Sequence, residues 1–216
     1  MKRVLVFLLC AATLSGTAFA ADAEKVLSAA ADVVSKMSST KQIPSNVLKS
    51  AKCVAVIPKM AKAGFIVGGK HGNGVVSCRT SSGWSAPGFI SMTGASIGLQ
   101  AGAVEQDIVL LMNDQGKQEL EGGHWDLGAE AVAAGPTGEA ASTAETGWKA
   151  PVLSYSNSGG AFAGFDVGGS KLSVDSDTIK STYGESGSLH SLLEGQVQPT
   201  SAAEPFLSSL KQAAGR

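Results

Sequence analysis

The stretch WSAPGFISMTGASIGLQAGAVEQDIVLLMN, residues 84–113, decides how the rest of the chain is interpreted. It has no ionisable residue between Trp84 and Gln100, and it holds four glycines: Gly88, Gly94, Gly98 and Gly102. Glycine in a regular element costs about 0.5–1 kcal/mol of chain entropy, so such a run indicates close backbone packing. It could be a membrane span, the nucleophile turn of a hydrolase, or the buried centre of a β-rich binding domain.

The first twenty residues have the pattern of a secretory signal peptide. Residues 1–3 are basic, residues 4–14 are apolar, and Ala18-Phe19-Ala20 fits an A-x-A cleavage site. We therefore expect cleavage after Ala20 and export to the periplasm or cell envelope. The remainder is long enough for one domain with a full core. No later segment offers the ~18–20 clean apolar residues of a spanning helix, and we expect no integral membrane protein.

Export would change the meaning of the cysteines. Cys53 and Cys78 remain after cleavage, and an even count in an oxidising compartment favours a disulfide. Two buried free thiols are the alternative.

The near-neutral net charge hides an asymmetry. Residues 21–80 carry nine lysines and arginines against three acids, a balance of +6, whereas residues 81–216 carry six bases against fifteen acids, a balance of −9. The basic third indicates an anionic partner, although the two parts could instead neutralise each other in the fold.

Periodicity predicts an α+β domain with a mainly antiparallel β core, sandwich- or barrel-like. An apolar stripe of i, i+1, i+4 and i+7 spacing predicts an amphipathic helix over 21–37, and Ala202–Ala214 is typical of a short C-terminal helix. A second short helix is expected within 41–52, a helical turn over 177–183 and a loop over 185–200. The predicted strands are 53–57, 63–68, 74–79, 87–92, 107–112, 125–136, 152–156, 161–167 and 170–174, with a hairpin turn at 69–73 and turns at 113–116 and 136–138.

The hydrolase interpretation depends on Gly94-Ala95-Ser96-Ile97-Gly98, which fits G-x-S-x-G. A nucleophile needs a strand before it, a helix after it, and an acid and a histidine later, here Asp175 and His190. The helix is lacking, because the following residues lead directly into the predicted strand 107–112. The three histidines have no metal-ligand spacing, and the basic segment lacks the aromatics of a nucleic-acid site.

Seven segments follow one another along the chain: Ile43-Pro44 with Leu48, AKCVAVIP (51–58), KAGFIVGGKHGNGVVSCR (62–79), residues 84–113, LGAEAVAAGPTG (127–138), LSYSNSGGAFAGFDVGGSKLSVD (153–175) and Tyr183-Gly184. In this order they resemble the SYLF-domain family of lipid-binding proteins. The resemblance covers about residues 41–184, so we expect a signal peptide over 1–20, a helix over 21–40, a SYLF-like core over 41–184 and a tail over 185–216. Bacterial members often show the same cysteine pair.

The resemblance implies a non-enzymatic module, without cofactor or metal, that binds anionic phospholipid through an amphipathic helix; in eukaryotic members the lipids are phosphoinositides. Asn157 and Gly159 stand where many members have arginine, and Glu139 replaces a base, so the acidic part is expected to attract lipid less. Fungal members are described as binding actin, which an exported protein would not meet. A partner-binding envelope protein and an esterase using Ser96 are the alternatives. The implied lipid-binding residues are Lys25, Val26, Val33, Val34, Lys36, Lys41, Lys49 and Lys52.

Overall fold

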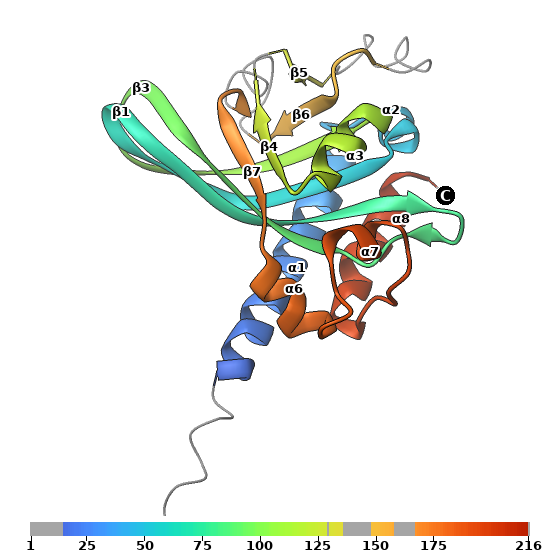
Figure 1. Cartoon of the computed structure of the whole chain (residues 1–216). Helices are drawn as coiled ribbons and strands as arrows, with labels where there is room; N and C mark the ends of the chain where they lie inside the picture. Colours follow the sequence, from blue (N-terminus) through green and yellow to red (C-terminus); the bar gives the residue numbers. More distant parts are fainter. Residues whose placement is uncertain (1–14, 129, 136–147, 158–166, 216) are drawn as a thin grey trace, which may run out of the picture.

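The computed structural model describes residues 15–128, 130–135, 148–157 and 167–215, with the backbone alone at 15–20, 64–67 and 96–104. A curled sheet carries helices from both ends of the chain (Figure 1). The elements in order are α1 (Ser15–Ser39), α2 (Ser45–Ser50), β1 (Cys53–Thr80), β2 (Gly83–Trp84), β3 (Gly88–Met112), α3 (Asp114–Glu121), β4 (His124–Leu127), β5 (Val132–Ala134), β6 (Val152–Ser156), β7 (Ser170–Val174), α6 (Ser176–Tyr183), α7 (Leu189–Leu193), η2 (Ser201–Ala203) and α8 (Glu204–Ala213).

Two long strands form the frame of the sheet. β1 and β3 pair antiparallel from Cys53↔Met112 to Val76↔Gly88, with register shifts between Ile57 and Met60 and between Gly64 and Ile66. The pair bends back on itself, so the two ends of β1 meet (Figure 1). The Arg79 N–H donates to the Lys52 carbonyl oxygen at 2.7 Å. The sequence predicts several separate strands here; the structure joins them into two continuous ones.

Glycine allows the two limbs of β1 to touch. A Cβ on Gly74 would collide with the Val56 carbonyl oxygen and lie 3.0 Å from Ile57 Cγ1, and one on Gly72 would lie 2.6 Å from Ile57 Cγ2. The predicted hairpin turn at 69–73 is therefore wrong, because these residues are strand. A glycine-rich segment can supply close approach rather than a turn, and local sequence does not distinguish the two.

The disulfide joins the two limbs at their meeting point. Cys53 and Cys78 are bonded and fully buried, with their Cα atoms 3.9 Å apart. The prediction of a bridge rather than two free thiols is confirmed. The bridge closes a segment of sequence separation 25, which contains most of β1.

The remaining strands extend each limb. β6 pairs with residues 108–112 of β3 and carries β5 in parallel, and β7 pairs with residues 90–94 of β3 and carries β4. The result is a half-barrel with an antiparallel-rich sheet, which confirms the predicted α+β class. Part of the predicted strand 161–167 and the predicted turn at 136–138 lie outside the described residues.

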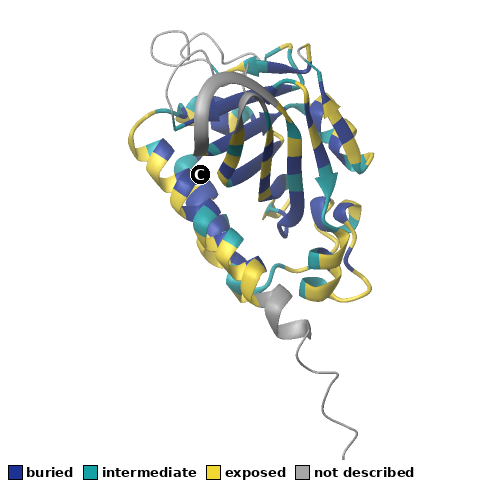
Figure 2. Ribbon diagram, turned by 90° about the vertical axis from the view of Figure 1, so that its left-hand side faces the viewer, coloured by how far each residue is buried: buried dark blue, intermediate teal, exposed yellow. Residues whose placement is uncertain are grey.

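The helices complete the core. α1 packs along α8 and against β1 (Figure 2), and Leu27, Met37, Phe206 and Leu210 are at most 1% exposed. The predicted helices 21–37, 177–183 and 202–214 are confirmed within α1, α6 and the η2–α8 segment.

Two helices occur where the sequence predicts none. α3 begins inside the predicted turn at 113–116, because the Asn113 side chain accepts from the Gly116 N–H at 3.0 Å and caps the helix. α7 lies in the predicted loop 185–200 and begins with a Ser188–Ser191 capping box. In α7, Leu189, Leu192 and Leu193 are buried, so tertiary packing stabilises a helix too short for the pattern to reveal.

Candidate functional site

The hydrolase alternative does not have the backbone it needs. Ser96 lies inside β3, paired with Gly68 of β1, so no strand-to-helix turn presents it. Its predicted acid, Asp175, caps α6 and accepts from the Thr178 N–H at 3.0 Å and from the Thr178 hydroxyl at 2.7 Å. Within residues 84–113, a Cβ added at Gly88 would collide with Leu189 Cδ1, and one added at Gly94 would lie 2.7 Å from Lys70 Cε, as expected for a closely packed centre.

The apolar residues of the implied lipid site belong to the core in this conformation. Val33 is 6% exposed, Val34 is 1% exposed, and Val26 is half-buried and packed against the core. The face of α1 that would meet a bilayer is therefore the polar one, unless the helix leaves its place on the sheet and α8. The stripe that indicates an amphipathic helix does not say whether its cover is protein or lipid.

Several bases of the basic third are used within the fold. Lys25 pairs with Asp22 at 3.1 Å, and Lys52 pairs with Asp114 at 3.3 Å. Arg79 donates through Nε to the Ala51 carbonyl oxygen at 3.0 Å and stacks on the Trp84 ring, 4.3 Å from its centroid. Burial lowers the pKa of this guanidinium. Part of the +6 balance thus stabilises the domain internally.

Three of the predicted lipid-binding lysines are exposed and lie close together in the sequence, and we call them the basic end. Lys36 lies in the last turn of α1, Lys41 follows that helix with φ 56°, and Lys49 lies in α2. None of them makes an ion pair with a residue of the described chain. Of the acids of α1, Asp22 and Glu24 stand near its start, whereas the exposed Asp32 lies one turn before Lys36.

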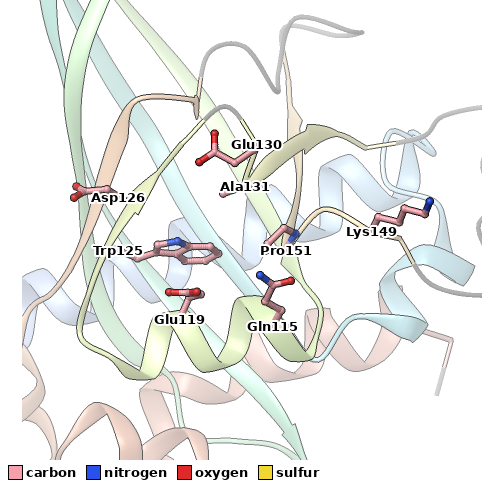
Figure 3. Close-up of a pocket in the computed structure, with 8 residues that line it drawn as sticks. All are labelled: Gln115, Glu119, Trp125, Asp126, Glu130, Ala131, Lys149 and Pro151. Atoms are coloured by element: carbon pink, nitrogen blue, oxygen red, sulfur yellow. The ribbon is translucent and has the colours of Figure 1, made fainter.

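A second charged surface, which we call the acidic pocket, lies between α3, β4 and the start of β6 (Figure 3). Its volume is about 380 Å³. Trp125 forms its inner wall and is 7% exposed. The sequence did not reveal this pocket, because its lining residues are spread over 37 residues of the chain, from Gln115 to Pro151. The only local indication is the alternation of buried and exposed residues in β4. The residues lining it are Gln115, Glu119, Trp125, Asp126, Glu130, Ala131, Lys149 and Pro151.

Other classes of site find no support in the described residues. They contain no group of three or more metal-ligating side chains. No helix among them is both long and apolar enough to pass through a bilayer. The candidate surfaces are thus the two charged regions of the half-barrel, the basic end and the acidic pocket.

Comparison with known proteins identifies the family of this domain. The family model for Ysc84, described as "Las17-binding protein actin regulator", matches residues 93–213, and the chain belongs to this family, which is the SYLF-domain family that the sequence motifs resemble. It is a family of binding and regulatory proteins. No solved structure gives a significant match.

The named relatives are longer than this chain. LAS seventeen-binding protein 3 of Saccharomyces cerevisiae is 38% identical over 179 residues, which are 80% of this chain and 39% of the relative. Protein YSC84 of the same species is also 38% identical, over 80% of this chain and 38% of its own. The SH3 domain-containing YSC84-like protein 1 of Mus musculus is 33% identical over 187 residues, 84% of this chain and 55% of the relative. The chain thus spans roughly two fifths to just over half of these relatives.

Proposed function

We propose that this domain binds anionic phospholipid at a membrane surface through the basic end, without catalysis. The observation that carries the proposal is that Lys36, Lys41 and Lys49 are exposed and without ion-pair partners among the described residues, whereas the other predicted lysines of the site, Lys25 and Lys52, are paired. Of the eight lipid-binding residues that the resemblance implies, the proposal therefore keeps three, the lysines of the basic end.

The expected affinity is low and depends on salt. Each lysine near an anionic surface contributes about 1 kcal/mol, so three contribute about 3 kcal/mol, roughly a hundredfold in partitioning. Because the lysines are exposed, salt weakens this attraction over a Debye length of about 8 Å at physiological ionic strength. The three valines do not contribute while α1 stays on the domain.

The test compares two charge reversals of equal size. Lys36→Glu with Lys49→Glu changes two residues of the basic end, and Lys171→Glu with Lys180→Glu changes two exposed lysines of β7 and α6. Lys41 is left in place, so that each variant changes two lysines.

Flotation is measured with vesicles of neutral lipid alone and with added phosphatidylglycerol or phosphoinositide. We expect binding to rise with anionic content and to fall at least tenfold in the first variant, with little change in the second. Equal binding to neutral and anionic vesicles, or equal loss in both variants, contradicts the proposal.

Binding of a protein partner is the second candidate function, and the names of the relatives favour it. The yeast relative is named a LAS seventeen-binding protein. By analogy, an acidic protein surface could dock on the basic end. Loss of a co-purified partner in the Lys36→Glu, Lys49→Glu variant, with vesicle binding unchanged, would favour this function over the first.

A further inference from the structure

The acidic pocket has an unbalanced charge. Glu119 of α3, Asp126 of β4 and Glu130 line it, against Lys149 as the one base of the lining. All four side chains belong to exposed residues, and none makes an ion pair or side-chain hydrogen bond within the described chain. The Asp126 side chain points to the other side of β4 from Trp125, whereas Glu119 and Glu130 flank the concavity (Figure 3). Two carboxylates at one concavity raise the local concentration of cations.

The inner wall adds a hydrogen-bond donor. Trp125 is only 7% exposed, and its indole faces the pocket (Figure 3). The indole N–H makes no hydrogen bond to a described residue. Unlike the buried indole N–H of Trp148, that of Trp125 is accessible, so it can donate to an acceptor that enters the pocket. The pocket therefore offers one donor and one aromatic face together with two carboxylates.

The size and spread of these groups select the kind of ligand. The described carboxylates do not converge into a metal-ligating group, so a small hard cation is not what they fit. About 380 Å³ suits an organic group, within the range of small-ligand sites. A guanidinium or ammonium group can lie against the indole and donate to carboxylates at once. The N–H, in turn, requires a neutral acceptor, since the carboxylates would repel a phosphate.

We propose that the acidic pocket binds a lysine or arginine side chain of a protein partner, with the Trp125 N–H donating to a peptide carbonyl oxygen next to that residue. A peptide supplies the cation and the neutral acceptor in one segment. The pocket and the basic end share no residue, so this site would add a protein contact to a domain that also meets an anionic surface. Either proposal can fail without the other.

The test uses a short peptide whose charge can be removed at constant shape. The probe is acetyl-Gly-Arg-Gly-amide, and its control carries citrulline, which keeps the outline of arginine and lacks the charge. The full chain labelled with ¹⁵N gives one indole signal for each tryptophan, and Trp125→Phe assigns the relevant one. We expect the arginine peptide at millimolar concentration to shift the Trp125 signal in a saturable way, and citrulline to do so at least fivefold less.

Variants of the rim complete the experiment. Glu119→Gln and Glu130→Gln are exposed changes that keep size, and we expect each to weaken arginine-peptide binding about tenfold. Asp177→Asn, an equally exposed acid of α6, serves as the control and leaves binding unchanged. The proposal is overturned if no shift occurs, if citrulline matches arginine, if the rim variants bind like the control, or if choline chloride gives the same response as the peptide.

Discussion

The disulfide between Cys53 and Cys78 is predicted to stabilise the domain by reducing the conformational entropy of the unfolded chain. Opening it frees a segment of sequence separation 25. On the chain-entropy model, a closed loop of that length contributes about 3.5 kcal/mol at 25 °C. For a domain of this size a change of 1 kcal/mol moves Tm by about 2–4 °C, so reduction is expected to lower Tm by roughly 7–14 °C.

The native structure is expected to survive reduction. The limbs of β1 also meet through the Arg79 N–H to Lys52 carbonyl hydrogen bond and through the packing of Gly72 and Gly74 on Ile57. These contacts do not need the bridge. The effect should therefore appear in the unfolded state: the urea m-value rises on reduction, because the unlinked chain exposes more surface.

The measurement is urea unfolding with and without a reductant, on a chain in which Cys10→Ser removes the third cysteine. A Cys53→Ala, Cys78→Ala variant is the control and should not respond to reductant. A difference under 1 kcal/mol would refute the loop-entropy reasoning. Loss of the native near-ultraviolet spectrum on reduction would refute the claim that packing alone holds the limbs together.

Three further predictions concern packing and one ion pair. Gly74→Ala should destabilise by about 1–3 kcal/mol in urea unfolding, since the backbone oxygen it meets cannot move aside, whereas Gly69→Ala, with no atom within 4 Å of its Cβ position, should change stability by less than half as much; equal effects would contradict the packing of the two limbs. Leu27→Ala in α1 should cost about 2–5 kcal/mol because this side chain is 1% exposed, and a cost below 1 kcal/mol would mean that α1 does not pack stably on the domain. The hydrogen bond and charge of Lys117 lower the pKa of the Glu194 carboxyl, so the pair contributes fully above the unfolded pKa of about 4.5 and loses its contribution as pH falls through the lower folded pKa; Glu194→Gln should therefore reduce stability by under about 1 kcal/mol at pH 7 and by progressively less as the pH is lowered below 4.5, and a difference that does not shrink with falling pH would show that the charge of Glu194 is not the cause.

Sequence periodicity predicted the class of fold and most elements, but not how the central strands continue. The runs 53–57 and 107–112 are correctly placed as strands, and the bridge of Cys53 is confirmed. The segment 69–73 was misassigned because glycine is typical of both turns and close strand packing. Only the tertiary contact with Ile57 decides between them, and that contact is not encoded within the segment itself.

The motifs at the closing end of the core have a clear physical role. The Tyr183 hydroxyl donates to the Pro87 carbonyl oxygen at 2.8 Å, which ties α6 to the start of β3, and burial raises the pKa of this phenol. Gly184, at φ 76°, ends the helix in a conformation that glycine adopts freely. These residues, which the resemblance singled out, thus fix the fold rather than a ligand.

The candidate surfaces were harder to predict because a charge count does not show which charges are available. Of the predicted site, Lys25 and Lys52 have carboxylate partners, and Val33 and Val34 are core residues. The acidic pocket could not be predicted from the sequence, because its carboxylates come together only when α3 and β4 pack in the folded chain. Charge segregation along the chain is therefore informative only after the internal pairs are removed. What remains here is a basic end and an acidic pocket on separate elements, to which the two proposals assign partners of opposite charge.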